Sequence, residues 1–568
     1  MLFRFLFLVI SLIASSAFAA DVNPPIDAGT LQRTLPPQEV EVPQNFDPKT
    51  RINDDQFNRP GSGVTVEIKQ FKITGNKLIT TQEIVSELSM YLNKTVGMAE
   101  LEKIAQAVGE LYRKKGYWAR AYLPDQDVKN GEIWIDVLEA KLGSIRIETN
   151  EENLRFSKDR AVSFIEKGQK SGDPLKILKL EKAIRDLDNV SGITAAVVLD
   201  RGKKEGETDV VVKMANTPYV TGSLRGDNHG SRATGYGRGV LYLTLDSPFK
   251  RGEQFNLQYV KTDEMDFYSL GASYPLRDDG TEASLMYTNM DYSLGFPLKD
   301  LMATGKSESY TASLSRPLWG GFNSDLKGSL SFTHKKYFNS ALDTTTSDKN
   351  IDGATLSAVL NRTDELFGGG MSIGSLSYVS GQLDLSNLVS DLEADKLSAK
   401  RQGHFSKVGL SFTRIQQLTP KNMLWFTVNG QYAFDNLDSA EKISLGGPTA
   451  VRAYPVAEAN GDHGLIINAE LRHQLTPKLQ ATAFYDWGQI TLNHETWTDW
   501  NSSDTSIKNR YVLKGAGVGF RLNFLDGYEL VGNVAQRIGK NPGASATDDD
   551  ADGTHHIIRS WFTLTKVF

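Results

Sequence analysis

The stretch LQATAFY (residues 479–485) places an apolar residue at every second position, and the intervening residues are mostly small or polar. The stretch YSLGASY (residues 268–274) shows the same alternation. Successive side chains of a β-strand point to opposite faces, so such a segment presents one face to lipid and the other to water. Comparable segments recur from residue 217 to the C-terminal Phe568. The sequence therefore predicts an outer-membrane β-barrel over residues 217–568.

The length of this region predicts its number of strands. Residues 217–568 comprise 352 residues, and at about 22 residues for each strand with its connection they form about 16 strands. The expected fold is an all-β transmembrane barrel of about 16 antiparallel strands, preceded by two small α/β domains. A barrel of this width can hold an aqueous channel. Something must then close the channel at rest.

The N-terminus predicts export from the cytoplasm. Arg4, the apolar residues 5–13 and the small-residue triplet at 17–19 are typical of a secretory signal peptide, which we assign to residues 1–20. The alternative is a buried N-terminal helix. The mean hydropathy of -0.34 argues against a helical membrane protein. The chain has no cysteine, and its net charge of -6 gives no reason to expect nucleic-acid binding.

Residues 21–60 are rich in proline and polar residues, with one short helical candidate at residues 27–35. We interpret this region as a tether that carries an N-terminal plug helix. The alternative is an unstructured linker, because so short a helix is marginal without a docking surface.

Residues 61–141 form the first predicted α/β domain. A strand is expected at 64–69, with a turn at 73–76. Thr80 and Glu83 match a capping box, and apolar residues then mark one face of two helices that end at Gly116. Two strands, at 117–123 and 131–139, complete a β-α-α-β-β order.

Residues 142–216 repeat the same order. Strands are expected at 143–148, 193–199 and 208–214, and helices at 157–167 and 173–187, the second with Pro174 in its first position. Two such units in succession are an internal repeat. The first unit resembles a polypeptide-transport-associated (POTRA) domain of two-partner secretion transporters, at Tyr112, Gly116-Tyr117, Ala121, Leu123-Pro124, Gln126 and Gly131. Two α/β domains with a role of their own remain the alternative.

A loop in the barrel region carries a second resemblance. Val451-Arg452-Ala453-Tyr454 lies in the segment 446–464 and is similar to the Val-Arg-Gly-Tyr tip of the sixth extracellular loop in these transporters, which folds into the pore. Ala453 replaces the family's glycine, which would be costly if the backbone there required a positive φ.

The next strand matches the partner motif of that family, Phe-x-Asp-x-Gly, at Phe484, Asp486 and Gly488. The alternation of residues 479–487 turns Asp486 to the lumen. The resemblance implies that Arg452 pairs with Asp486, and that Val451, Arg452, Tyr454, Phe484, Asp486 and Gly488 are loop-lock and pore-gating residues. The alternative is a surface arginine and an ordinary lumenal carboxylate.

The C-terminus resembles the signal by which outer-membrane barrels are recognised for insertion. Phe562, Leu564 and Phe568 share one face, while Lys566 interrupts it with a long side chain that can snorkel to the interface.

The sequence contains only partial matches to known catalytic, phosphate-binding and metal-binding motifs. Gly370-Met371-Ser372-Ile373-Gly374 fits a serine nucleophile pattern, but lies in a predicted strand at 367–378 without a following helix. Gly305-Lys306-Ser307 lacks the first glycine of a phosphate loop. The run at 548–553 begins like a calcium loop but has Arg559 at position 12, although weak calcium binding remains open, and His555-His556 lacks a third ligand. We expect no enzyme activity, no cofactor and no metal.

The chain thus resembles the TpsB transporters of two-partner secretion, the haemolysin, adhesin and contact-dependent toxin type. The resemblance implies a protein of the bacterial outer membrane with periplasmic N-terminal domains. Its POTRA domains would capture an unfolded exoprotein, and its barrel would export it without nucleotide hydrolysis. Implied partners are that exoprotein, outer-membrane lipid and the barrel-assembly machinery, but no nucleic acid. Alternatives are an outer-membrane insertase of the same superfamily and a pore for small solutes.

Overall fold

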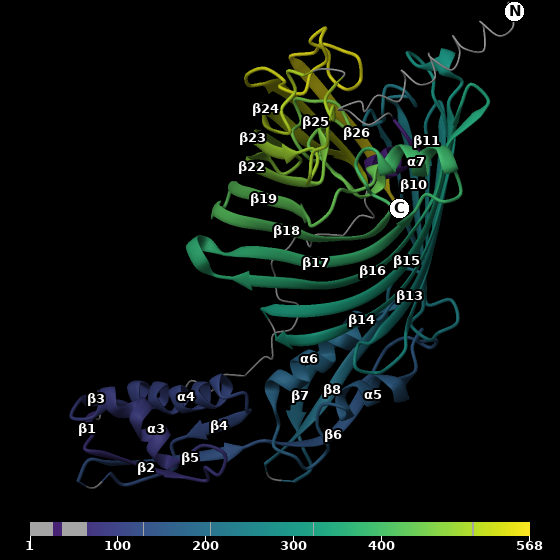
Figure 1. Cartoon of the computed structure of the whole chain (residues 1–568). Coiled ribbons are helices and arrows are strands. Elements are labelled where there is room, and N and C mark those ends of the chain that lie inside the picture. The colour runs from purple at the N-terminus through teal and green to yellow at the C-terminus, as the bar shows by residue number, and fades with distance from the viewer. Residues whose placement is uncertain (1–25, 37–64, 129, 205, 322, 503–504) are drawn as a thin grey trace, which may run out of the picture.

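The computed structural model describes residues 26–36 and 65–568, apart from residues 129, 205, 322 and 503–504. The predicted signal peptide at 1–20 lies outside the described residues, as does most of the linker. Figure 1 shows a large barrel with two small α/β units lying below one end of it.

The barrel is closed by 16 antiparallel strands, which confirms the predicted fold class. Each strand pairs with its neighbour along the chain, and the last pairs with the first. The strands are β9 (Val220–Asp227), β10 (Arg238–Asp246), β11 (Gln254–Lys261), β12 (Met265–Pro275), β13 (Glu282–Ser293), β14 (Thr304–Gly321), β15 (Ser324–Ala341), β16 (Thr344–Asp364), β17 (Gly370–Asp384), β18 (Gly403–Thr419), β19 (Asn422–Ala433), β22 (His463–Thr476), β23 (Leu479–Thr491), β24 (Arg510–Leu525), β25 (Tyr528–Arg537) and β26 (Ile558–Val567).

Alternation along the strands divides the wall into two faces. On β23, Tyr485 is 43% exposed on the outer face, whereas Asp486 is completely buried on the lumenal face. The predicted parity of this strand is confirmed. The closing pair is short, because β26 and β9 are in register only from Thr563 opposite Asp227 to Val567 opposite Ser223.

The first α/β unit contains more elements than predicted. They are β1 (Thr65–Glu67), β2 (Gln70–Thr74), α3 (Thr81–Leu88), η1 (Ser89–Tyr91), β3 (Thr95–Gly97), α4 (Met98–Lys114), β4 (Ala119–Tyr122) and β5 (Glu132–Glu139). The single strand expected at 64–69 was wrong. The chain instead bends at Ile68, whose backbone bonds to residues 93 and 94, so β1 pairs with β3 while β2 joins the main sheet.

The capping and helix-termination motifs predicted for this unit are present in the structure. Thr80 and Glu83 form the capping box of α3, and Gly116 follows α4 with a positive φ of 85°. Tyr112 is buried on α4, and its hydroxyl donates to Glu139 Oε1 at 2.8 Å. Burial, together with Glu139, raises the pKa of Tyr112, so this hydroxyl remains a donor at physiological pH. The bond joins the helix layer to β5.

The second unit consists of β6 (Lys141–Glu148), α5 (Lys158–Glu166), α6 (Ile177–Asp188), β7 (Ile193–Arg201) and β8 (Glu207–Asn216). Its β-α-α-β-β order matches the prediction. Pro174 is not the first residue of α6, however. It forms a bridge with Lys141 at the edge of β6, and the helix begins three residues later. Both units share the sheet order in which a central strand is parallel to one neighbour and antiparallel to the other.

The second unit is attached to the barrel through its helices. Arg160 on α5 donates to Asp278 at 2.8 Å and to the carbonyl oxygens of Arg251 and Pro275, which lie at the turns β10–β11 and β12–β13 of the barrel. Arg185 on α6 donates to the carbonyl oxygen of Ser324. The second unit is therefore attached to the turns at this end of the barrel.

The remaining helical elements are α2 (Ala28–Thr34), η2 (Lys299–Leu301), η3 (Leu366–Gly368), α7 (Val389–Lys396) and η4 (Ser439–Glu441). Two short strands, β20 (Ile443–Ser444) and β21 (Asn460–Gly461), pair within the loop between β19 and β22. Among the described residues, no helix is both long and apolar enough to cross a membrane.

Candidate functional site

The barrel lumen contains the short helix predicted at residues 27–35. Asp27 caps α2, accepting from the backbone N–H of Thr30 at 2.8 Å. Ala28 to Leu31 are buried against the inner wall and the β19–β22 loop. Gly29 approaches η4 closely, because a Cβ at this position would lie 2.7 Å from the Cβ of Ala440. The structure thus supplies the docking surface that so short a helix requires.

Ionic contacts hold the N-terminal end of α2. Lys349 on β16 is buried, with its Nζ atom 2.9 Å from Asp438 and 3.4 Å from Asp27. Ser439 also donates to Asp27, at 2.5 Å. One wall lysine therefore joins the helix to the β19–β22 loop.

The C-terminal end of α2 has cationic partners. Arg238 on β10 donates to the carbonyl oxygen of Thr34 at 3.0 Å and forms two bonds with Asp227 on β9. Arg33 donates to Asn460 Oδ1 at 3.1 Å and to the carbonyl oxygen of Lys442. Cations near a helix C-terminus interact favourably with its free carbonyl groups. Through Asn460, α2 also contacts the loop that carries Arg452.

The loop tip, residues 451–454, lies against the inner wall. Arg452 donates from Nε and Nη2 to the two oxygens of Asp486, at 2.9 and 2.6 Å, and its backbone N–H donates to the same carboxylate at 3.1 Å. Nη1 donates to Glu470 at 2.7 Å. Asn468 bridges Asp486 Oδ1 and the carbonyl oxygen of Ala450. The contact implied by the resemblance is present, with two further wall residues taking part.

The packing around this pair is close. The Arg452 guanidinium lies 3.5 Å from the ring centroid of Phe484, and the ring of the buried Tyr454 receives Arg537 at 4.6 Å. Ala453 does not adopt a positive φ. Its Cβ faces Gly515 on β24, where an added Cβ would lie only 2.7 Å away. The alanine is therefore accommodated without backbone strain.

Gly488 provides the space for the loop tip, because an added Cβ would meet Val451 Cγ2 at 2.9 Å and the side chain of Leu445 at 3.1 Å. We expect Gly488→Val to displace the tip and to increase its cleavage by added protease about fivefold or more, since a core clash costs about 1–3 kcal/mol. Limited proteolysis of the purified protein measures this. Gly226→Val is the matched control, since a Cβ there meets open space. Equal protection in both variants would contradict the prediction.

The last strand also contacts the loop tip. Trp561 on β26 is buried, and its Nε1–H donates to the carbonyl oxygen of Arg452 at 2.8 Å. Its indole packs edge-on against His229, whose backbone N–H donates to Asp227. Since Arg238 joins Asp227 to α2, side chains of β26, β9 and β10 connect the loop tip with the helix. The sequence analysis did not identify Asn468, Glu470, Trp561 or Gly515.

The C-terminal residues lie on the outer face. Phe562, Leu564 and Phe568 are 46%, 45% and 56% exposed, respectively. Lys566 donates to the carbonyl oxygen of Asp526 at 2.6 Å, and its Nζ lies over the ring of Tyr528. Its charge thus reaches the periplasmic turn while its stem covers the wall, as snorkelling requires. The role of these residues in barrel assembly stays a prediction.

The weak chemical motifs lie in barrel strands and an outer loop. The strand around Ser372 begins at residue 370 rather than 367, and Ser372 Oγ accepts from Arg414 at 3.0 Å. Gly305-Lys306-Ser307 is part of β14. Asp550, in the acidic run, accepts from Arg537 and Arg559. Among the described residues, no three side chains of His, Asp or Glu are grouped to hold a metal ion.

Models of two known protein families match this chain. The family model described as haemolysin secretion/activation protein ShlB/FhaC/HecB matches residues 206–522, which is more than half of the chain. The chain belongs to this family. A second model, described as a POTRA domain of ShlB type, matches residues 66–140.

Individual relatives support the assignment over nearly the full length. The heme/hemopexin transporter protein HuxB of Haemophilus influenzae is 26% identical, with 95% of each chain covered. The outer membrane transporter CdiB of Dickeya dadantii is 23% identical, covering 81% of this chain and 82% of its own. The solved structure of CdiB from Escherichia coli has the same fold, with a TM-score of 0.67 at 18% identity, covering 89% of this chain and 91% of its own.

The ShlB/FhaC/HecB family consists of TpsB transporters, which export a partner protein across the outer membrane. This member is thus an outer-membrane transporter of two-partner secretion, with its N-terminal units in the periplasm. Its lumenal helix and loop tip stand in the path that an exported chain would follow.

Proposed function

We propose that the protein exports an extended exoprotein through a lumen that opens when α2 and the loop tip leave their present positions. The observation that carries this proposal is the occupation of the lumen by two elements held through polar contacts. These polar groups are buried at rest, and they can bond to water instead once either element moves into the open lumen. The class of cargo is a large adhesin, haemolysin or toxin.

Capture begins at the periplasmic units. In the first unit β2 and β4 are the edge strands, and in the second β6 and β7 are. Exposed backbone groups of an edge strand can bind an extended segment by β-augmentation. On the outer face of the first sheet, Tyr122, Trp134 and Leu138 are each 39–44% exposed and offer apolar contacts for cargo side chains.

Export requires no nucleotide, and cargo folding outside the cell retains the chain that has emerged. Gly305-Lys306-Ser307 lies within β14 and does not form a loop, which supports this part of the proposal. We also propose that the protein is not an enzyme, and the position of Ser372 within a barrel strand, bonded to Arg414, supports this. We further propose that the barrel-assembly machinery inserts it through the C-terminal strand.

Gly29→Cys combined with Ala440→Cys tests the movement of α2. The native chain has no cysteine, so the engineered pair is unambiguous. The ideal Cβ positions are 2.7 Å apart, about 1 Å closer than in a disulfide, and the Cβ on residue 29 would also lie 2.9 Å from Ala440 Cα, so the α2 backbone must shift by about 1 Å for the bond to form. We expect the oxidised variant to release no exoprotein and a reductant to restore release.

The measurement is a comparison of all proteins released into the medium by deletion cells that carry each variant. Each single cysteine variant serves as a control for the substitution itself. Full release by the oxidised double variant would show that α2 need not move. Unchanged medium together with loss of outer-membrane barrels, on deletion of the gene, would favour the insertase alternative.

A further inference from the structure

The loop that joins β25 to β26, residues 538–557, contacts the β19–β22 loop, and we call it the outer loop. It lies at the end of the barrel away from the two α/β units (Figure 1). Asn541 Nδ2 donates to Glu458 Oε1 at 2.9 Å, and the backbone N–H of Ala551 donates to Glu458 Oε2 at 2.7 Å. Each oxygen of this one carboxyl group therefore joins the outer loop to the loop that carries the tip.

Glu458 is an unusual partner for such a contact, because it is completely buried and both of its donors are neutral. A second carboxylate lies beside it, since Asn541 Nδ2 also donates to Asp550 Oδ1 at 2.9 Å. Arg537 and Arg559 both donate to Asp550. Within the described part of the chain, no cationic side chain forms an ion pair with Glu458 itself. The cations of this cluster thus compensate its neighbour.

A negative charge on Glu458 is therefore unfavourable in this position. Burial, and after it the carboxylate of Asp550, raise the pKa of Glu458 to about 7, although the hydrogen bonds from Asn541 and Ala551 oppose the rise. The other charged and titratable groups that surround it come from β24, β25, β26, the outer loop and its own loop. They are Tyr511, Arg537, Arg559, Asp550, Asp552 and Tyr454.

The sign of the pH effect follows from this raised pKa. In contact with the outer loop Glu458 binds its proton more tightly than an exposed glutamate, whose pKa is 4.5. The proton therefore stabilises the contact fully below about pH 4.5, and this stabilisation is lost as the pH rises to about 7.

The backbone on both sides of Glu458 is strained. Ala457 and Ala459 have φ values of 63° and 56°, in the left-handed region that alanine rarely adopts. Such conformations persist only where surrounding contacts hold them. Loss of the contacts made by Glu458 therefore allows this segment to relax, which favours a second arrangement of the β19–β22 loop.

We propose that the outer loop clamps the β19–β22 loop through protonated Glu458 and releases it when Glu458 ionises. The ionised carboxylate leaves the cluster because water solvates it better than two neutral donors beside Asp550 do. Since the outer loop lies on the extracellular side, the clamp responds to the external pH. This inference concerns the protein at rest, and it does not depend on the class or the route of the cargo.

Spin labels on the full-length purified protein test the clamp. Thr449→Cys on the β19–β22 loop and Thr547→Cys on the outer loop place one label on each exposed position of a chain without native cysteine. Double electron–electron resonance then measures the distance between the labels. We expect a single short distance at about pH 5. By about pH 8 a longer distance should gain at least about tenfold in population relative to the short one.

Two substitutions of Glu458 have opposite expected effects. Glu458→Gln keeps the size of the side chain without its charge, so the short distance should persist at both pH values. Glu458→Ala removes both acceptors, so the longer distance should appear at both. If Glu458→Ala fails to form a heat-resistant barrel, Glu458→Gln decides the question. A pH response that survives in Glu458→Gln would overturn the proposal, as would a single unchanged distance in the wild type.

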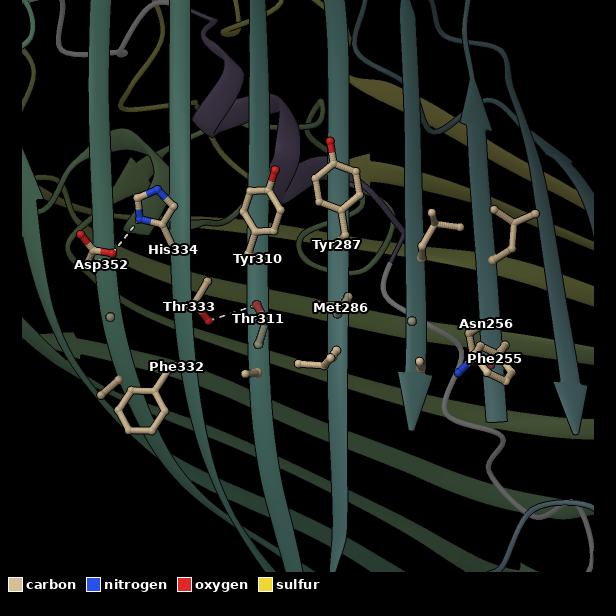
Figure 2. Close-up of a pocket in the computed structure, with 18 of the residues that line it drawn as sticks. Phe255, Asn256, Met286, Tyr287, Tyr310, Thr311, Phe332, Thr333, His334 and Asp352 are labelled. Carbon is tan, nitrogen blue, oxygen red and sulfur yellow. Dashed lines mark hydrogen bonds and ion pairs between the residues drawn. The ribbon is translucent and has the colours of Figure 1, made fainter. Parts of the chain in front are cut away.

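Histidine substitutions separate this response from other groups that titrate in the same range. His334 pairs with Asp352 on the outer wall, where Nδ1 and Oδ1 lie 2.7 Å apart (Figure 2). Their side chains are 39% and 66% exposed, so this pair lies in water and far from a buried site. His334→Gln, and His555→Gln on the outer loop, should both retain the wild-type response. Loss of the response in either variant would assign the pH dependence to that histidine and overturn the role of Glu458.

Discussion

Replacing Arg452 with alanine should reduce export of the partner protein about tenfold or more while leaving barrel insertion intact. The change removes both side-chain bonds to Asp486 and the bond to Glu470. Asp486 is completely buried. Stranding a buried carboxylate costs about 3–5 kcal/mol, and a change of only 1.4 kcal/mol alters the population of the wall-bound tip tenfold. A tip that is not held on the wall stays in the lumen as a loose loop in the path of the exported chain, so we expect export to fall. The released exoprotein is measured in the medium, and insertion by heat-modifiable migration.

Two variants control for other effects. Arg452→Lys keeps the charge but loses the two-pronged geometry, so we expect intermediate export. Arg414→Ala breaks a similar pair, in which Arg414 contacts Asp364 at 2.6 and 2.9 Å on the outer wall. It should export normally. Normal export by Arg452→Ala in a correctly inserted barrel would refute the role assigned to the loop tip.

Replacing Lys349 with methionine should open the resting channel. The substitution leaves Asp27 on α2 and Asp438 on the adjoining loop without their shared lysine. Breaking a buried ion pair by removing one partner costs about 3 kcal/mol or more, and α2 has only seven residues with which to offset it. We expect the open fraction of single channels in planar bilayers to rise about tenfold or more.

Lys306→Met is the matched control. Lys306 pairs with Asp291 at 3.2 Å, but its side chain is 71% exposed on the outer wall, so its loss should leave the open fraction unchanged. An open fraction equal to that of wild type in Lys349→Met would show that this lysine does not hold α2. A raised open fraction in both variants would indicate that the substitutions destabilise the barrel in general.

Local signals explain why parts of the fold were predictable. A side-chain period of two requires only neighbouring residues, so the wall and the lumenal position of Asp486 followed from residues 479–487. Capping at Thr80 and the left-handed turn at Gly116 are equally local. The first strand failed for the opposite reason. Its division at Ile68 depends on residues 93 and 94, whose approach no local pattern records.

The site was predictable only as a pair of motifs. Arg452 and Asp486 were joined by resemblance, but Glu470, Asn468 and Trp561 carry no motif that marks them. Trp561 lies 109 residues from the carbonyl oxygen of Arg452 to which it donates. Lys349 is 322 residues from Asp27. Such contacts exist only once the barrel has closed and its strand register is set.

The sequence by itself determined the class of protein, the two faces of its wall and the repeat of its periplasmic units. Periodicity and caps act within a few residues, so each segment records them independently. The tertiary structure alone decided what lies inside the barrel. Closure brings β9, β10 and β26 together with α2 and the loop tip, and burial in the lumen converts their scattered charges into specific partners.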